Sequence, residues 1–414
     1  MKNSAQKESA LLNEFMKEYE PLLDKFLDEI KDVKMDNLPQ PFFPTWNEGY
    51  EECKYKIAFV GWETRDNESL SDFYQTAKTD KIGALQSYNE VIEGKDFAFT
   101  GYGNNFGTGF WDFNMKFLGR FYNLDWKKIK EKKYPEILDT ILWGNLNSLE
   151  RYEVTAKEKG GSYEEWQKVK NASTILDNAG PLIKVFKPNI LIVLRWMDND
   201  SWLTGSYNTT HEIIIENKLE YYYVHETGTH VFWTCHPGYL SRISCDFDEI
   251  ILNILLKVNE KKVFDDFPGS RIIYAVNKLN HQVEQLSEEM NLSSFKMPLG
   301  GKYSGFYFSK PDWKKYRIGF EFDSAWGRSF FGGVKKNYKE YPNLDAEPVS
   351  RKFMMNEQIT EHWPYWYWYE DNYRDWNEKL YEEIENGNFI LKIKSDLNRM
   401  LNTMNEFEKE GIEL

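Results

Sequence analysis

The stretch Ile57-Ala58-Phe59-Val60-Gly61-Trp62-Glu63-Thr64 decides the fold of the first half of the chain. Its apolar run has the length of a buried strand, and a glycine and a carboxylate follow the run. Similar runs recur along the chain, so that the set comprises Lys56 to Val60, Thr140 to Trp143, Ile190 to Leu194 and Val231 to Thr234. Helical segments between such runs favour parallel strands whose crossover helices cover both sheet faces. The pattern predicts an α/β fold, a three-layer α/β/α sandwich around a four-stranded parallel sheet.

Further elements are expected around this sheet. Apolar side chains at helical spacing between residues 8 and 33 predict one long amphipathic helix, interrupted near Pro21. Another helix is predicted from Ala172 to Val185, because the proline of Lys187-Pro188 cannot continue it. The segments Glu212 to Ile215 and Leu219 to Val224 predict an added antiparallel hairpin.

The 414 residues exceed what one hydrophobic core usually organises, which predicts two domains. A charged, turn-prone stretch follows the apolar helix expected at Phe247 to Val258, and the boundary is predicted there. The domains would span residues 1–262 and 263–414. The second is expected to be a smaller α+β domain with a helix near 274–290, strands near 304–309, 316–323 and 328–334, and helices near 371–385 and 390–408.

Composition excludes several classes of protein. A hydrophobic fraction of 41% and an aromatic fraction of 17% indicate a folded chain. No apolar run is long enough to span a membrane and the N-terminus has no signal-peptide core, so a cytoplasmic protein is expected. Three cysteines are too few for a disulfide framework, and the six histidines show no metal-ligand spacing, so reduced thiols and no metal are expected. The net charge of −14 opposes non-specific binding to phosphates.

Polar side chains follow three of the four predicted strands. They occur in Gly61-Trp62-Glu63-Thr64, in Gly144-Asn145-Leu146-Asn147 and in Cys235-His236-Pro237-Gly238-Tyr239-Leu240-Ser241. In an open parallel sheet, ligands bind outside the carboxyl ends of the strands. We therefore expect a carboxylate, an amide and an imidazole to converge on one crevice.

This set resembles the uracil-DNA glycosylase superfamily over roughly residues 40 to 258. The first motif, a glycine followed two positions later by a carboxylate, is matched by Gly61 and Glu63. Asn145 matches the asparagine after the second strand, and the segment His236 to Ser241 matches the His-Pro motif with its intercalating leucine. The chain departs from the family pattern in both loops, with Trp62 and Arg65 in the first loop and Gly238-Tyr239 in the last.

The resemblance implies a monofunctional DNA N-glycosylase that needs neither metal nor cofactor and excises a flipped uracil or a modified base, such as a hypermodified pyrimidine. Such chemistry serves base excision in DNA repair or antiviral defence. Glu63 would stabilise an oxocarbenium-like sugar or orient water, and His236 would donate a hydrogen bond to a base oxygen. Asn145 would read the edge of a pyrimidine. The residues expected to bind the base and the DNA are Gly61, Trp62, Phe99, Tyr102, Tyr239, Leu240 and Arg242.

Other interpretations remain open. Glu63, Asn145 and His236 can each have a purely structural role, as a helix cap, a salt-bridge partner or a turn residue. The chain can be a non-catalytic regulator that binds DNA or protein, with a partner or a second copy on the C-terminal domain. It can also be a nuclease acting through Glu321 and Asp323. The aromatic stretch from Trp363 to Tyr369 is expected to pack against the C-terminal strands, or alternatively to stack exposed bases.

Overall fold

The computed structural model describes residues 9–47, 49–62, 69–86, 108–153, 156–177, 179–195, 199–243, 245–296, 304–323, 330–345, 347–353, 360–370, 373 and 376–414. Contacts divide the chain into unit 1, which comprises Met1–Arg120 and Leu124–Phe247, and unit 2, which comprises Phe121–Asn123 and Asp248–Leu414. The units part at Phe247 rather than at residue 262. Helix α13 (Phe247–Glu260), expected to close the first domain, belongs to unit 2 apart from its first residue. The boundary follows tertiary contacts, which turn-prone residues did not indicate.

Unit 1 is built on a seven-stranded sheet in the order β1-β3-β2-β4-β7-β6-β5. Its four central strands are mutually parallel: β3 (Ile141–Asn145), β2 (Ile57–Gly61), β4 (Ile190–Leu194) and β7 (Thr229–Thr234). They coincide with the four predicted apolar runs. Most of their residues are buried, because helices cover both faces and leave no face for polar side chains. The predicted α/β class is confirmed.

Three further strands enlarge the sheet beyond the predicted four. The predicted hairpin is present as β5 (Thr209–Ile215) and β6 (Leu219–Val224), and β6 pairs antiparallel with β7. At the opposite edge, β1 (Thr45–Trp46) pairs antiparallel with β3. Strand β1 was not predicted, because two residues are too few to show a periodic pattern.

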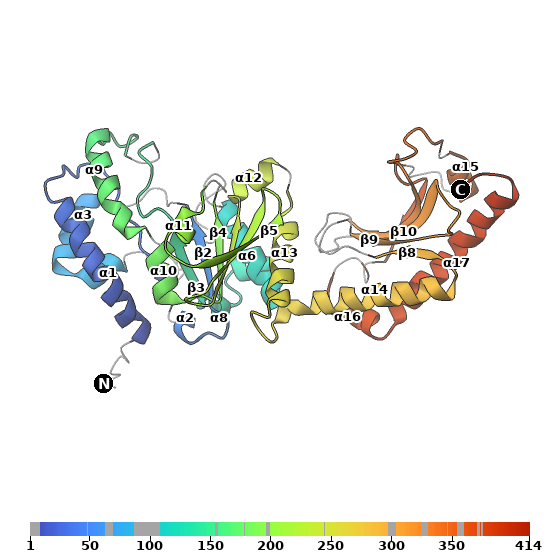
Figure 1. Cartoon of the computed structure of the whole chain (residues 1–414), viewed down its shortest axis with the longest axis horizontal. Coiled ribbons are helices and arrows are strands. Elements are labelled where there is room, and N and C mark those ends of the chain that lie inside the picture. Colours follow the sequence, from blue (N-terminus) through green and yellow to red (C-terminus); the bar gives the residue numbers. More distant parts are fainter. Residues whose placement is uncertain are drawn as a thin grey trace. The chain divides into compact units, whose positions relative to one another are not determined.

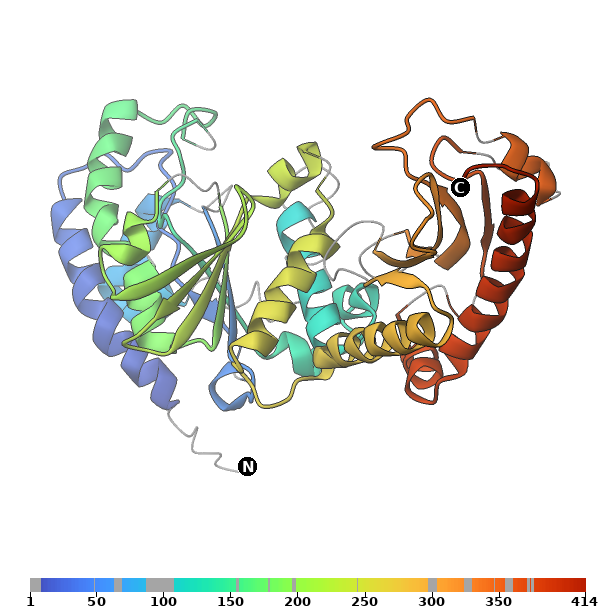
Figure 2. The ribbon, with the colours of Figure 1, turned by 45° about the vertical axis from the view of Figure 1, so that its right-hand side comes forward.

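Helices lie on both faces of this sheet (Figures 1 and 2). One face carries α1 (Ala10–Glu29), α3 (Leu70–Thr79), α9 (Tyr163–Ser173) and α10 (Ala179–Phe186), and their apolar side chains share a core with Val60, Leu142, Val193 and Trp233. On the other face lies α6 (Thr108–Tyr122), whose Phe117 meets Phe59 with ring centroids 6.0 Å apart. The shorter helices in the described part of unit 1 are α2 (Gly49–Glu52), α4 (Lys81–Leu85), α7 (Trp126–Lys130), α8 (Pro135–Leu138), η1 (Thr174–Leu176), α11 (Ser201–Thr204) and α12 (Pro237–Arg242).

Helix α1 corrects one expectation. The predicted interruption near Pro21 is wrong, because the helix is continuous from Ala10 to Glu29 and contains Pro21. Its buried face, which includes Phe15, Tyr19 and Leu23, extends across the proline. Tertiary packing on both sides of Pro21 outweighs the hydrogen bond that the proline cannot donate.

Unit 2 is an α+β module around an antiparallel five-stranded sheet in the order β12-β11-β10-β9-β8. Strands β9 (Gly305–Ser309), β10 (Tyr316–Phe322) and β11 (Phe330–Lys336) were predicted, whereas β8 (Ser293–Phe295) and β12 (Tyr365–Trp368) were not. Phe330 on one sheet face lies against Phe389 of α17 (Asn388–Lys409), with ring centroids 5.2 Å apart. The other helices of unit 2 in the described residues, apart from α13, are η2 (Pro268–Ser270), α14 (Arg271–Glu289), α15 (Glu347–Lys352) and α16 (Glu378–Glu385). Across the described part of the chain, no helix has the length and apolar character needed to cross a bilayer.

Candidate active site

The carboxyl ends of β2 and β3 meet side by side in unit 1. Gly61 and Asn145 are paired in the parallel register, and beyond them the Leu146 and Asn147 amides donate to the carbonyl oxygens of Gly61 and Trp62 at 3.0 and 2.9 Å. A β carbon built on Gly61 would lie 2.7 Å from Asn145 Oδ1, so the amide lies directly over the glycine. Asn145 is 1% exposed. Two of the predicted site residues are thus in contact, and the Asn145 side chain lies in the protein interior.

An aromatic ring from α6 packs against the same position. Phe110 Cε2 would lie 3.4 Å from a β carbon on Gly61, and the ring also packs near Trp143. Phe110 was not among the predicted site residues; in the sequence it directly follows the glycine-rich segment 100–109. The predicted rings Phe99 and Tyr102 lie outside the described residues. Phe110 is therefore an aromatic ring that contacts the position where Gly61 and Asn145 meet.

The loop after β7 contains the predicted imidazole. His236 is exposed and is the N-cap of α12, where its Nδ1 accepts a hydrogen bond from the Gly238 amide at 3.1 Å. A neutral ring that accepts at Nδ1 carries its proton on Nε2, so the cap selects the tautomer with an Nε2–H donor. The helix-cap role and a donor role are compatible, because they use different ring nitrogens.

The N-terminal turn of α6 lies between these two parts of the site. A β carbon on Gly109 would lie 3.4 Å from Pro237 Cβ and 3.8 Å from the Gly238 amide nitrogen. The next residue, Phe110, reaches Gly61. Continuous contacts therefore run from Asn145 through Gly61, Phe110 and Gly109 to the loop that begins at His236.

The remaining predicted residues of this loop differ in exposure. Tyr239 is half-buried and Arg242 is exposed, so both can reach a ligand. Leu240 is fully buried, because α12 directs it into the protein interior. Leu240 therefore cannot insert into a base stack from this conformation, which corrects its expected role as an intercalating wedge.

Two arginines flank Trp62. The guanidinium carbons of Arg151 and Arg195 lie 5.1 and 5.3 Å from the centroid of the indole ring, within the range of cation–π attraction. Arg195 follows β4 directly, and its amide donates to the Thr234 carbonyl of β7 at 2.9 Å. Trp62, which was predicted to contact substrate, therefore brings positive charge to the carboxyl edge of the sheet. Neither arginine was among the predicted site residues.

Beside Arg195 lies a pocket of about 480 Å³. Its polar lining includes Asn147, Asp177, Arg195 and Ser201, from segments that follow β3, α9 and β4. Asp177 Oδ1 accepts hydrogen bonds from the amide and the hydroxyl of Ser148 at 3.3 and 3.4 Å. Burial raises the pKa of the Asp177 carboxyl, although the positive charges of Lys170 and Arg195 oppose the shift. A pocket carboxylate with a perturbed pKa is a candidate functional group, and no sequence motif indicated it.

The structure brings together Gly61, Trp62 and Asn145, and contacts through α6 link them to the His236 loop. Glu63 lies outside the described residues. No family model matches the chain, and no curated protein matches it. The assignment of this site therefore rests on residue chemistry and on the geometry of the strand ends.

The pair considered for nuclease activity lies in unit 2. Glu321 is 2% exposed, and its carboxylate Oε1 is ion-paired with Lys335 Nζ and accepts a hydrogen bond from the Tyr307 hydroxyl. Burial, with the negative charge of Glu321, raises the pKa of Tyr307. Within the described ranges, no three or more His, Cys, Asp or Glu side chains gather as metal ligands would. Lys335 thus occupies the Glu321 oxygen that would have to bind the metal ion in a metal-dependent nuclease.

Proposed function

We propose that unit 1 is a DNA N-glycosylase, which hydrolyses the bond between deoxyribose and a flipped uracil or modified base. One observation carries the proposal. Gly61, Asn145 and His236 all lie at the carboxyl ends of parallel strands, where the Asn145 amide lies over Gly61 and α6 contacts both Gly61 and the His236 loop. Across the sheet, the four parallel strands lie in the order second, first, third and fourth, so the strand order reverses between β2 and β4, where open α/β sheets bind ligands.

In the proposed reaction, two opposite charges develop together, one on the sugar and one on the base. As the C–N bond breaks, its electron pair leaves with the base, and the sugar becomes an oxocarbenium-like cation that water attacks at the anomeric carbon. Glu63, two residues after Gly61 in the sequence, is proposed to stabilise that cation and to accept the proton from water. Nε2–H of His236 is proposed to donate to a base oxygen as negative charge accumulates there.

The other residues of the site are proposed to hold the base and the strand. Asn145 would pair with the edge of the extruded base, with Phe110 as the ring beneath it. Arg195 and Arg151, held at Trp62, would contact phosphates on either side of the flipped nucleotide. This local positive charge answers the objection that a chain with a net charge of −14 repels DNA.

The decisive experiment is mass spectrometry of bases released from DNAs that contain uracil, oxidised bases or glucosylated cytosines. The wild-type chain should release one of these bases without added metal. Glu63→Gln should lower the rate by about 10²- to 10⁴-fold, the usual contribution of a general base. The matched control is Glu52→Gln, an exposed carboxylate of α2 before the amino end of β2, which should release base at the wild-type rate.

Two outcomes would reject the proposal. Release of no base from any of the three DNAs, combined with binding to DNA, would favour the non-catalytic regulator. Metal-dependent strand cleavage that survives Glu63→Ala would favour the nuclease of unit 2.

A further inference from the structure

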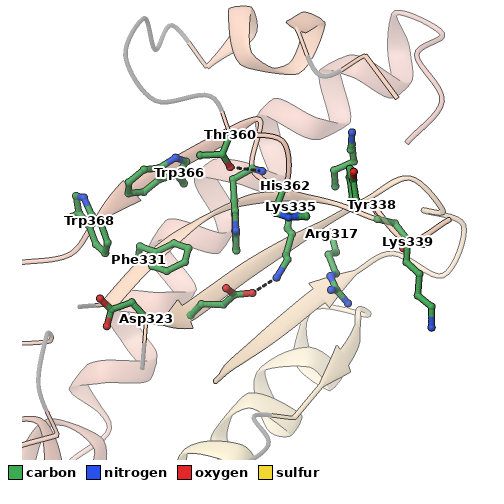
Figure 3. A pocket seen from close by; sticks show the side chains of 14 residues that line it. Arg317, Asp323, Phe331, Lys335, Tyr338, Lys339, Thr360, His362, Trp366 and Trp368 are labelled. Carbon is green, nitrogen blue, oxygen red and sulfur yellow. Dashed lines mark hydrogen bonds and ion pairs between the residues drawn. The ribbon is translucent and has the colours of Figure 1, made fainter. Parts of the chain in front are cut away.

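One face of the sheet in unit 2 carries polar and aromatic side chains, whereas the other face packs on helices. Arg317 and Glu321 of β10 pair with Lys335 and Phe331 of β11. Farther across the sheet, Trp368 of β12 pairs with Phe331. Residues two apart on a strand share a face, so these side chains lie on one surface. A pocket of about 780 Å³ opens there (Figure 3).

Aromatic rings form one end of this pocket. The Phe331 ring meets Trp363, Trp366 and Trp368 with centroids 5.0, 5.7 and 5.4 Å apart, each edge to face. Trp368 is 43% exposed, so an indole of this cluster remains accessible to a ligand. Figure 3 shows Trp366 and Trp368 beside Phe331, away from Lys339. The cluster presents a platform on which a flat ring can stack.

Cationic groups form the other end. Arg317 lies over the Tyr307 ring, with its guanidinium carbon 4.0 Å from the centroid, and Lys335 Nζ lies 5.0 Å from the Trp363 centroid. The charged lining comprises Arg317, Lys335, Lys336, Lys339, Glu321 and Asp323. The Lys336 ammonium donates to the carbonyls of Pro342 and Leu344, so three cations face two carboxylates, a balance of +1 in a chain whose net charge is −14. The pocket is thus positive where most of the chain is negative.

The pocket thus offers a stacking platform at one end and cationic groups at the other. The ligand should therefore combine a flat ring with an anionic group.

We propose that this pocket binds a nucleotide, with its base stacked on Trp368 and Trp366 and its phosphate at Arg317 and Lys339. The nucleotide can be free or part of a single strand, since both present a base and a phosphate. This site is distinct from the glycosylase site proposed in unit 1 and does not depend on it.

The test uses the full-length chain and two probes, thymidine 5′-monophosphate and an oligothymidylate of about ten nucleotides that carries one 5-bromodeoxyuridine. Illumination of the bromodeoxyuridine complex, followed by peptide mass spectrometry, should locate the crosslink in residues 360–370. Trp368→Ala and Arg317→Gln should each weaken binding by roughly tenfold or more, as loss of a base stack or a phosphate contact does. Trp368→Phe, which keeps a stacking ring, should retain most of the affinity.

Matched controls come from the helices of unit 2. Tyr274→Ala removes an exposed ring of α14, and Lys392→Glu reverses an exposed charge of α17; both should bind like wild type.

Equal affinity for both probes would identify a free nucleotide as sufficient, whereas oligonucleotide binding alone would identify a single strand. The proposal fails if the crosslink falls only outside 360–370, if both pocket variants bind within twofold of wild type, or if thymidine without phosphate binds as tightly as the monophosphate. His236→Ala should leave this crosslink unchanged, so failure here and failure of the glycosylase proposal can be told apart.

Discussion

Asn145 Oδ1 would lie 2.7 Å from a β carbon at position 61, so any side chain there would force the Asn145 amide to move. That distance is well below a van der Waals contact, and Phe110 closes the same space from α6. A substitution at Gly61 can therefore test whether the Asn145 amide takes part in the proposed base release.

We expect Gly61→Ala to move the Asn145 amide and to overpack the strand ends. Stability should fall by roughly 1–3 kcal/mol, as is usual for an added core methyl group, and urea unfolding measures this change. Base release should fall more than the folded fraction does. Gly180→Ala is the matched control for stability, because its new methyl group would meet Ser206 Oγ at 3.9 Å, an ordinary van der Waals distance. Wild-type stability and activity in Gly61→Ala would contradict the assignment.

His236→Ala should separate capping from catalysis. The variant loses the Nδ1 cap of α12, at a cost of about 1 kcal/mol, and also loses the proposed Nε2–H donor. Base release should fall by about 10²- to 10³-fold, the range for removal of one transition-state donor. Ser162→Ala removes the cap of α9, where the serine hydroxyl accepts from the Glu165 amide at 3.3 Å, and should cost similar stability without loss of activity. If both variants lost the same activity, His236 would act only as the N-cap of α12.

Asp177→Asn should stabilise the protein at neutral pH. Burial raises the pKa of Asp177 in the folded state, so the folded protein binds this proton more tightly than the unfolded chain does. The contribution is favourable below the unfolded pKa and is lost as pH rises through the folded pKa. The neutral amide avoids that loss and can still accept from Ser148. Melting temperatures should therefore diverge in favour of Asp177→Asn toward neutral pH and converge in acid; a pH-independent difference would contradict the prediction.

Lys335→Met should be strongly destabilising, because it leaves the Glu321 carboxylate buried without its cation. Removing one partner of a buried pair costs about 3–5 kcal/mol, whereas replacing both partners is tolerated far better. The double variant Glu321→Gln, Lys335→Met should recover most of the stability in urea unfolding. Lys31→Met breaks an exposed pair with Asp28 and should leave the free energy of unfolding close to that of the wild type. If the double variant is no more stable than Lys335→Met, the lost ion pair does not explain the effect.

The sequence predicted the parallel strands well and the second unit in part. Ile190 to Leu194 was predicted with the bounds that β4 has, because a strand buried on both faces shows as a continuous apolar run. Strand β12 was missed, since the aromatic run at Trp363–Tyr369 does not alternate between apolar and polar residues. It is a strand because β11 offers a pairing edge.

By itself, the sequence determined the α/β class, the four parallel strands and the expectation that Gly61, Asn145 and His236 lie at the carboxyl ends of these strands. It could do so because a strand buried on both faces shows as a continuous apolar run in the local sequence. Only the tertiary structure decided that Phe110 packs on Gly61, that Arg195 lies at Trp62, that Asp177 lines a pocket and that Leu240 is buried. Each of these facts is a contact or an enclosure made by residues distant in the chain. Such contacts depend on how crossover helices pack, which no local spacing encodes.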